Sequence, residues 1–371
     1  MFFFGIEHEV AFLNKDGKFA DFTCTKFADF NQIIDCLPIY SSDYPQLHVG
    51  DAGIREKRWY IEGFERFHDS DKVIDYIPKG IEIRTTIHSD ICSAIAELSE
   101  SFNLLEKIAS NYGFSPVLIS HNPYQTSFEP QPALNDYELQ ILRANNEEFN
   151  AKIPMITYGP DLNISATYLS KEQVIDIGCK LNYYSPYIVP FSFSSPFYNG
   201  SLWSGLSVRT FFRTGKRPAV TVYLENKEDL IKTEPAFTEK SRISAEIGRI
   251  EFKAFDSCDD FSIYAGLLAL LKGLVLDKTL TGRALIPDAE MHQLSARYGF
   301  EDVDVMAIAT QVLEAAGNAL ASDPDISLLA PLQVMLEKRQ TPAHQLIQAF
   351  KTFGSIEDAI KQTYTTQQQH S

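Results

Sequence analysis

The sequence has few cysteines and lacks the glycine motifs by which many enzymes bind nucleotides. The five cysteines are scattered along 371 residues, their number is odd and no two of them form a CxxC pair. A zinc cluster or disulfide framework is therefore not expected, and a reducing compartment is favoured. No GxxxxGK(S/T) phosphate loop, GxGxxG turn or GxSxG elbow occurs. A P-loop nucleotidase or Rossmann enzyme is thus not supported, and metal and side chains would have to hold the phosphates of any bound nucleotide.

Positive charge and long apolar runs are also scarce. The 33 lysines and arginines face 49 aspartates and glutamates, so the net charge is −16, which argues against a nucleic-acid or anionic membrane partner. The most apolar stretch, Tyr264 to Leu276, contains Lys272 and is too short to span a bilayer. Glu7 and Glu9 interrupt the amino terminus where a signal peptide would continue its apolar run. We therefore expect a cytoplasmic protein.

Three short segments share one pattern: 5–9, 80–85 and 249–255. Each is apolar at every second position, as in a strand with one face against a core. The charged residues on the opposite face are Glu7, Glu9, Glu82, Arg84, Glu251 and Lys253. Carboxylates at positions i and i+2 of a strand lie about 7 Å apart and suit a divalent metal. The sequence predicts one sheet face that combines carboxylates and cations, and the alternative is three half-exposed strands with charged outer faces.

Helical periodicity is clearest after the second of these segments. Ser89 or Asp90 can cap a helix that ends near 111–113, and a second helix is expected from Ser170 to just before Pro186. A long apolar helix is expected from about 262 to 282. Further strands are expected at 60–66, 72–77, 162–167 and 219–224, and the region 19–78 shows no long helical periodicity.

The order of elements predicts an α+β fold, in which a mainly antiparallel sheet packs its apolar face on helices and leaves the other face open for chemistry. We expect three regions. Residues 1–285 form a catalytic α+β domain, residues 286–364 form a helical extension packed on it, and residues 365–371 form a flexible tail.

The residues 5–10, Gly-Ile-Glu-His-Glu-Val, resemble the opening strand of the glutamate–cysteine ligase and carboxylate–amine ligase superfamily. Other pieces match in the same order along residues 3–280: 82–85, 195–197, 205–209 and 250–253. The resemblance implies a glutamine synthetase-like fold, with a curved sheet that forms a funnel lined by acidic metal ligands. It also implies that ATP and Mg²⁺ support the joining of a carboxylate to an amine through an acyl phosphate.

The resemblance and the charged strands together suggest the site residues. Glu7, Glu9, Glu82 and Glu251 are the candidate metal ligands, and the alternative for each is a surface glutamate paired with a lysine or arginine. Arg209 and Lys253 are the candidate catalytic cations, since phosphoryl transfer between anions needs charge neutralisation. Candidate contacts to substrate or nucleotide are Arg84, Arg209, Asn163 and Ser165. His8 points away from this face and is expected to be a core histidine.

Two departures from the family pattern concern the substrate. Bacterial carboxylate–amine ligases often carry His-x-His where this chain has Asn163 and Ser165, and many carry arginine where Lys253 stands. The leading hypothesis is an ATP-dependent glutamate–cysteine ligase, which makes γ-glutamylcysteine for glutathione biosynthesis, acting on small molecules as a monomer or homodimer. The alternatives are a ligase for another acid or amine, a metal-dependent hydrolase, and a catalytically silent binding protein.

Overall fold

The computed structural model describes residues 1–41, 43, 57–69, 72–144 and 150–368, the last six by their backbone. The central sheet has the strand order β10-β9-β11-β6-β1-β4-β3. These strands span, in chain order, β1 Phe2–Leu13, β3 Trp59–Phe67, β4 Val73–Arg84, β6 Pro160–Ala166, β9 Val220–Leu224, β10 Thr238–Lys240 and β11 Ile250–Phe252. Two short strands, β2 (Phe19–Ala20) and β5 (Ser115–Val117), pair with the far end of β1.

The described strands of the central sheet pair antiparallel, except for β9 and β10, which pair parallel. The prediction of a mainly antiparallel, curved sheet in an α+β fold is therefore confirmed. The three segments with one pattern lie in β1, β4 and β11, on the same sheet. β4 is the direct neighbour of β1, whereas β6 separates β1 from β11.

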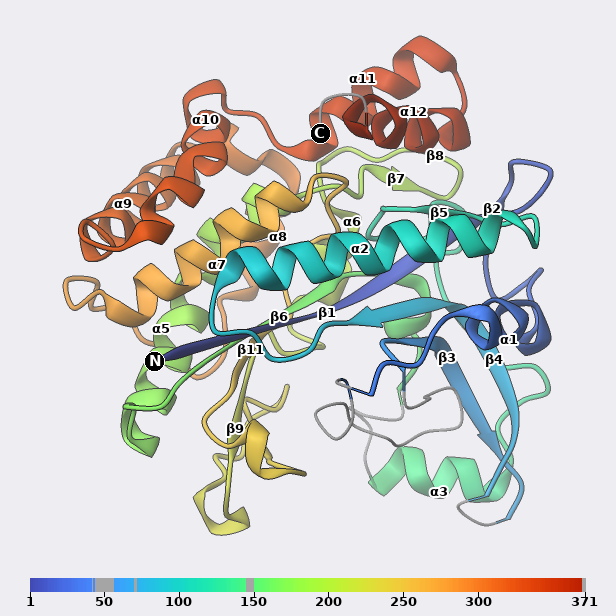
Figure 1. The fold of residues 1–371 in the computed structure, drawn as a ribbon, viewed down its shortest axis with the longest axis horizontal. Helices are drawn as coiled ribbons and strands as arrows, with labels where there is room; N and C mark the ends of the chain where they lie inside the picture. Colours follow the sequence, from blue (N-terminus) through green and yellow to red (C-terminus); the bar gives the residue numbers. More distant parts are fainter. Residues whose placement is uncertain (42, 44–56, 70–71, 145–149, 369–371) are drawn as a thin grey trace.

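Helices cover the apolar face of this sheet, where Ile6, Ile81, Ile164 and Ile250 are buried in one large core. The long helices α2 (Ile91–Ser110), α5 (Lys171–Ile188) and α7 (Phe261–Leu276) pack on the strands and on one another. Figure 1 shows α2 and α7 running in roughly the same direction as β1. Asp90 caps α2 and Ser170 caps α5, as their sequences predict. The opposite face of the sheet carries the charged side chains.

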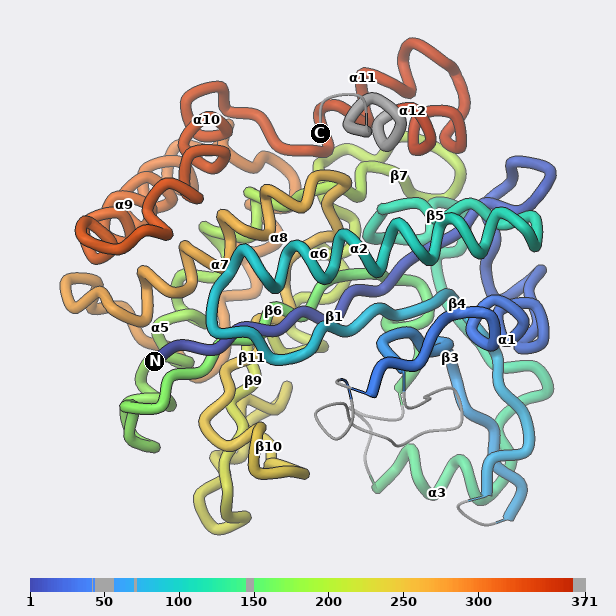
Figure 2. The backbone as a smooth tube through the Cα atoms, viewed as in Figure 1, coloured from blue at the N-terminus to red at the C-terminus, as the bar shows by residue number. Residues whose placement is uncertain are grey.

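Five helices follow α7 in the described part of the chain, and α10, α11 and α12 lie at the top of the view in Figure 2. They are α8 Ala289–Tyr298, α9 Val303–Ala319, α10 Ala330–Lys338, α11 Pro342–Phe353 and α12 Ile356–Gln368. α9 packs against α5 and α7. α11 and α12 form a separate small core with β1 and β5, through Leu346, Ile360, Leu13 and Val117. These helices therefore pack behind and beside the sheet.

Several elements differ from the expectation. The segments at 72–77 and 80–85 form one continuous strand, β4, and α7 ends at Leu276. α5 continues through Pro186 to Ile188. Pro186 cannot donate to the Asn182 carbonyl, which accepts from Ser185 Oγ at 2.8 Å instead. α12 continues to Gln368, into the expected flexible tail.

Three helices were not predicted from the sequence. α1 (Phe27–Cys36) lies in a region expected to lack helices, where Phe30, Ile33 and Ile34 have helical spacing and are buried. α3 spans Asp136–Ala144, and the short α6 spans Val208–Arg213 and contains Arg209. The minor elements are β7 Phe197–Tyr198, β8 Ser201–Leu202 and the 3-10 turns Pro154–Ile156, Val189–Ser192, Lys227–Asp229, Ser244–Glu246, Gly299–Glu301 and Pro324–Leu329. Within the described ranges, no helix combines the length and the apolar character needed to cross a membrane.

Candidate active site

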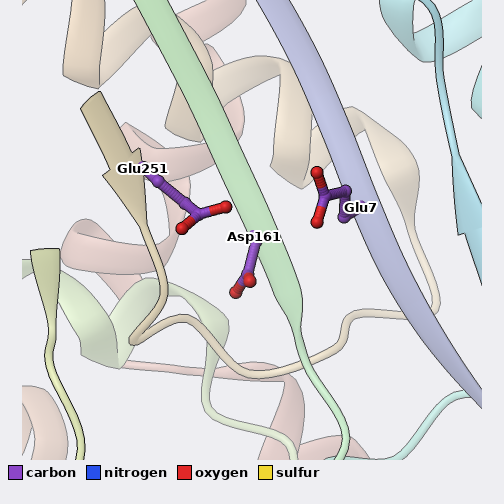
Figure 3. Close-up of side chains that lie close together, drawn as sticks. All are labelled: Glu7, Asp161 and Glu251. Carbon is purple, nitrogen blue, oxygen red and sulfur yellow. The ribbon is translucent and has the colours of Figure 1, made fainter. Parts of the chain in front are cut away.

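Three neighbouring strands bring three carboxylates together on the open face of the sheet. Glu7 on β1, Asp161 on β6 and Glu251 on β11 each place a carboxylate oxygen within 4.8 Å of the other two. Figure 3 shows the three side chains extending from adjacent strands towards a common region. Glu7 pairs with Asp161 across the sheet, so the antiparallel register creates this group, which we call the first carboxylate cluster.

A second carboxylate cluster lies on the other side of β1. Glu9, Glu62 and Glu82 also place carboxylate oxygens within 4.8 Å of one another. Glu9 and Glu82 are direct partners in the ladder between β1 and β4. Glu62 lies on the edge strand β3, beside the same part of β4. Alternation places Glu7 and Glu9 on the same face of β1. Glu7 belongs to the first cluster because Asp161 of β6 is its neighbour, and Glu9 belongs to the second because Glu82 of β4 is its neighbour.

Cations neutralise the first cluster. The Lys253 ammonium lies 2.8 Å from Asp161 Oδ2 and 2.6 Å from Glu251 Oε2. The Arg249 guanidinium lies 3.5 Å from Glu7 and 3.6 Å from Glu251, and the Tyr223 hydroxyl donates to Glu251 at 2.9 Å. Burial alone would raise the pKa of Glu251, but Lys253 and Arg249 outweigh it and hold the pKa at about 2. Glu251 is therefore ionised, whereas burial and the neighbouring charge of Glu251 raise the pKa of Glu7. Lys253 occupies a position that a metal ion could take.

The second cluster has less positive charge. A bulge in β4 at Lys79 turns its ammonium to within 2.5 Å of Glu9 Oε1, where it also donates to two backbone carbonyl groups. Burial, followed by the nearby carboxylates of Glu62, Glu7 and Glu9, raises the pKa of Glu82 well above its ordinary value. Converging oxygen ligands with excess negative charge fit Mg²⁺, which binds carboxylates and retains waters. Both clusters therefore fit divalent metal ions by their chemistry.

A cavity adjoins each end of this acidic region. The larger has a volume of about 490 Å³ and is mostly apolar, with Phe3, Phe4, Ile87, Ile164 and Ile243 in its wall. Three candidate contact residues, Arg84, Asn163 and Ser165, line this cavity as well. A polar cavity of about 210 Å³ contains both Glu9 and Glu82, together with Asp161, Arg209 and Lys253. Glu7 lines both cavities, so the first cluster lies at their junction.

Arg209 takes part in the wall of the polar cavity and holds its backbone in place. Its Nη1 donates to the carbonyl of Phe255 at 2.8 Å and its Nη2 donates to that of Lys253 at 3.0 Å. A side chain at Gly159 would collide with this guanidinium and force it to shift from its hydrogen bonds. The buried Asp256 lies 3.9 Å from Arg209 and accepts a hydrogen bond from Ser195 Oγ at 2.8 Å. Arg209 therefore fixes the segment that carries Lys253 while facing the polar cavity.

The other candidates occupy defined positions. The Arg84 guanidinium lies 5.0 Å over the ring of Tyr60, and Asn163 Oδ1 accepts from Arg249 Nη1 at 3.1 Å. His8 is buried on the core side, 2.9 Å from the Tyr264 hydroxyl, and burial lowers its pKa to about 4. The expectation that His8 is a core histidine is therefore confirmed.

Sequence reasoning missed several residues that the structure adds to the site. Asp161 belongs to the first cluster, Glu62 to the second, and Lys79 and Arg213 contribute cations. Asp161 stands two positions before Asn163, and Glu62 lies in a predicted strand, so alternation alone could have placed both on a common face. No comparable pattern marks Lys79, because only the bulge directs it into the site.

Comparisons with known proteins agree on the fold. No family profile and no curated protein sequence matches the chain. Among solved structures, a bifunctional glutathione synthetase from Pasteurella multocida superposes with a TM-score of 0.61 at 12% identity, covering 99% of this chain and 52% of that one. Glutamate–cysteine ligase from Francisella tularensis, in complex with AMP, gives 0.57 at 11% identity over 98% and 88%. The chain shares the fold of these ligases.

A third structure, that of PafA, the ligase of the prokaryotic ubiquitin-like protein Pup, has a TM-score of 0.52 at 12% identity, over 98% of this chain and 68% of that one. This chain spans about half the length of the bifunctional synthetase. The ligase fold confirms the resemblance drawn from the sequence motifs at the level of architecture.

Proposed function

We propose that this protein is an ATP- and Mg²⁺-dependent carboxylate–amine ligase. The observation that carries the proposal is that Glu7 of the first cluster lies where an apolar cavity meets a polar, arginine-lined one, and that the second cluster lines the polar cavity. This arrangement provides a place for a base, a metal-binding region for phosphates and a polar space for the reacting groups. Five unpaired cysteines agree with a reducing cytoplasm.

The apolar cavity is the proposed nucleoside site. Its volume of about 490 Å³ and its aromatic and aliphatic walls suit a flat, apolar base. A nucleotide in this cavity would direct its phosphates towards Glu7 and the first cluster, because Glu7 lies at the junction with the polar cavity. Arg84 and Arg249 also line it and offer cations to the phosphates.

The polar cavity is the proposed place of reaction. A carboxylate oxygen of the acid substrate attacks the γ-phosphorus, the bond to the ADP oxygen breaks, and an acyl phosphate forms. The amine nitrogen then attacks the acyl carbon, phosphate leaves and one amine proton is released. Bound metal would supply charge neutralisation during both steps. Arg209, Arg213 and Lys253 line this cavity and would stabilise the charge on the transferring group.

For substrates, we propose glutamate as the acid and cysteine as the amine, as in glutamate–cysteine ligase. The support is the fold shared with that enzyme and the order of the sequence motifs. The alternative is a ligase of the same reaction type for another acid or amine. The departures from the family pattern bear on this choice of substrates, because Asn163 and Ser165 line the apolar cavity and Lys253 lines the polar one.

The deciding experiment separates activation of the acid from use of the amine. Purified protein is incubated with ATP, Mg²⁺, glutamate and hydroxylamine, and formation of hydroxamate is measured. Hydroxylamine traps an acyl phosphate whichever amine the enzyme normally uses. Hydroxamate that depends on both ATP and the acid supports the ligase. Substrate turnover without ATP would refute it and favour the metal-dependent hydrolase.

A matched pair of variants tests the role of the first cluster. Glu7→Gln should abolish the stabilisation that ATP analogue and Mg²⁺ together give in thermal unfolding, because one of three ligand groups loses its charge. Glu290→Gln, an exposed position on α8, should keep this stabilisation. An undiminished response in Glu7→Gln would argue against metal binding at Glu7.

A further inference from the structure

A third cavity extends the site at the end away from the apolar one. It has a volume of about 350 Å³ and shares Ile153 and Arg217 with the polar cavity. Its lining residues are Asn150, Lys152, Ile153, Gly215, Lys216, Arg217 and Glu234. Three of these are cations and one is an anion, in a protein whose net charge is −16. We call this space the basic chamber.

The turn after α6 places two of these cations. α6 ends at Arg213, and the backbone N–H groups of Lys216 and Arg217 both donate to the Arg213 carbonyl at 3.1 Å. Gly215, which lies between Arg213 and Lys216, has a positive φ of 75°, a conformation that glycine adopts without strain. The tight turn brings Lys216 to the wall of the basic chamber and Arg217 to the boundary with the polar cavity. Their position is therefore built into the backbone.

Lys152, Lys216 and Arg213 lack a strong anionic partner among the described residues. Lys152 pairs with Glu129 at 2.9 Å, and both side chains are more than 60% exposed, so that pair is weak. Among the described residues, no carboxylate forms an ion pair with Lys216 or with Arg213. Arg213 is only 8% exposed and its Nη1 donates to the Pro218 carbonyl. A buried cation without an anionic partner is unfavourable, and a bound anion would relieve it.

The position of the basic chamber indicates which substrate it receives. If the nucleotide fills the apolar cavity, the acyl phosphate forms in the polar cavity, next to the clusters. The amine must then approach the acyl carbon from the remaining side, where the basic chamber opens. Resting on the proposed ligase function, we propose that the basic chamber binds the amine substrate and that this substrate carries a carboxylate, held by Lys216 and Arg217.

The test compares amines with and without a carboxylate. Cysteine and cysteamine share the amine and the thiol, so the ratio of their kcat/KM values in ATP-dependent phosphate release measures recognition of the carboxylate alone. Glycine with methylamine and alanine with ethylamine extend the comparison to other amines. We expect the wild-type enzyme to prefer the carboxylated member by about tenfold or more. Lys216→Glu should lower this ratio by about tenfold, because it replaces a partly screened attraction with repulsion.

Lys240→Glu is the matched control, since Lys240 is an exposed lysine on the edge strand β10, and its ratio should equal that of the wild type. An equal preference for both members of every pair, or an unchanged ratio in Lys216→Glu, overturns the proposal. A higher KM for the acid in the hydroxamate reaction of Lys216→Glu, with an unchanged amine ratio, would assign the chamber to the acid and also overturns it. If the wild type forms hydroxamate, the negative results above refute only the role of the basic chamber. If the wild type forms no hydroxamate with any acid, the proposed ligase function is refuted.

Discussion

Replacing Lys253 by methionine should tighten metal binding at the first carboxylate cluster while slowing catalysis. The Lys253 ammonium lies 2.6 Å from Glu251 and 2.8 Å from Asp161, so it occupies the space between two of the three carboxylates. A metal ion bound there must displace it. Methionine has a similar length and no charge, and it therefore removes the competing cation with little change in volume.

The magnitude follows from the two contacts. A hydrogen bond to a charged group contributes about 1.5–3 kcal/mol, so displacing the ammonium from both carboxylates costs about 3 kcal/mol at the lower limit. Hydration of the released ammonium returns part of this cost, because the Lys253 side chain is 21% exposed. We expect Mn²⁺ to bind the variant between about 10-fold and 100-fold more tightly, at about 1.4 kcal/mol per tenfold.

The metal-free Lys253→Met variant should be less stable to unfolding than the metal-free wild type. Without Lys253, Glu7, Asp161 and Glu251 keep Arg249 as the close cation, and loss of one partner from a buried pair costs about 3 kcal/mol or more. The unfolding temperature should fall without metal and recover when Mn²⁺ is added. The rate of ATP-dependent turnover should fall by about 100-fold, because one stabilising charge next to the transferring group is lost.

The assay is a titration with Mn²⁺ in the absence of nucleotide, followed by electron paramagnetic resonance and by thermal unfolding. Lys240→Met provides the control for loss of a lysine elsewhere. An Mn²⁺ affinity equal to that of the wild type, with no loss of stability in the metal-free variant, would show that the ammonium does not compete with metal, and the reasoning from these distances would be wrong.

Three further changes test other parts of the site. Glu82→Gln should stabilise the metal-free protein at pH 7.5 by about 1 kcal/mol, since the raised pKa of Glu82 shows that its charge is unfavourable in the fold. Mg²⁺ should stabilise this variant less than the wild type, and an equal Mg²⁺ response in thermal unfolding would contradict the prediction. Gly159→Ala should lower both the unfolding temperature and kcat, because its methyl group collides with the Arg209 guanidinium; unchanged values would contradict the required close approach. Burial lowers the pKa of His292 to about 3, so its contribution to stability is complete above pH 6.5 and is lost as the pH falls towards 3. His292→Gln should therefore lose about 2 kcal/mol less than the wild type between pH 7 and pH 5 in urea unfolding, and equal losses would refute this.

The alternation of apolar and charged residues was sufficient to predict the charged sheet face. The period of two predicted strands that contain all four candidate metal ligands. Glu7 and Glu9 lie in β1, Glu82 lies in β4 and Glu251 lies in β11. The caps of α2 and α5 were also evident, since a polar residue before an apolar period marks a helix start. Local patterns of this kind depend on residues close together in the sequence, so they can be recognised before the fold is known.

The extents of several elements were not predictable in the same way. Pro78 and Gly80 indicate a turn locally, yet β4 continues through them, because pairing with β1 on one side and β3 on the other supports the strand. Arg209 lies in α6, a short helix capped by Ser207 that was not predicted from the sequence. In each case contacts from distant parts of the chain outweigh the local preference.

The sequence by itself determined that acidic strands would share one sheet face and that no glycine loop would hold phosphate. The tertiary structure decided how that face is divided: the order of β11, β6, β1 and β4 separates Glu7 from Glu9 and brings Asp161 and Glu62 to their sides. It also decided which cations reach the carboxylates and where the cavities open. These features depend on strand order, on a bulge and on a turn, which fix distances between residues far apart in the chain, and the pattern of any single segment does not contain them.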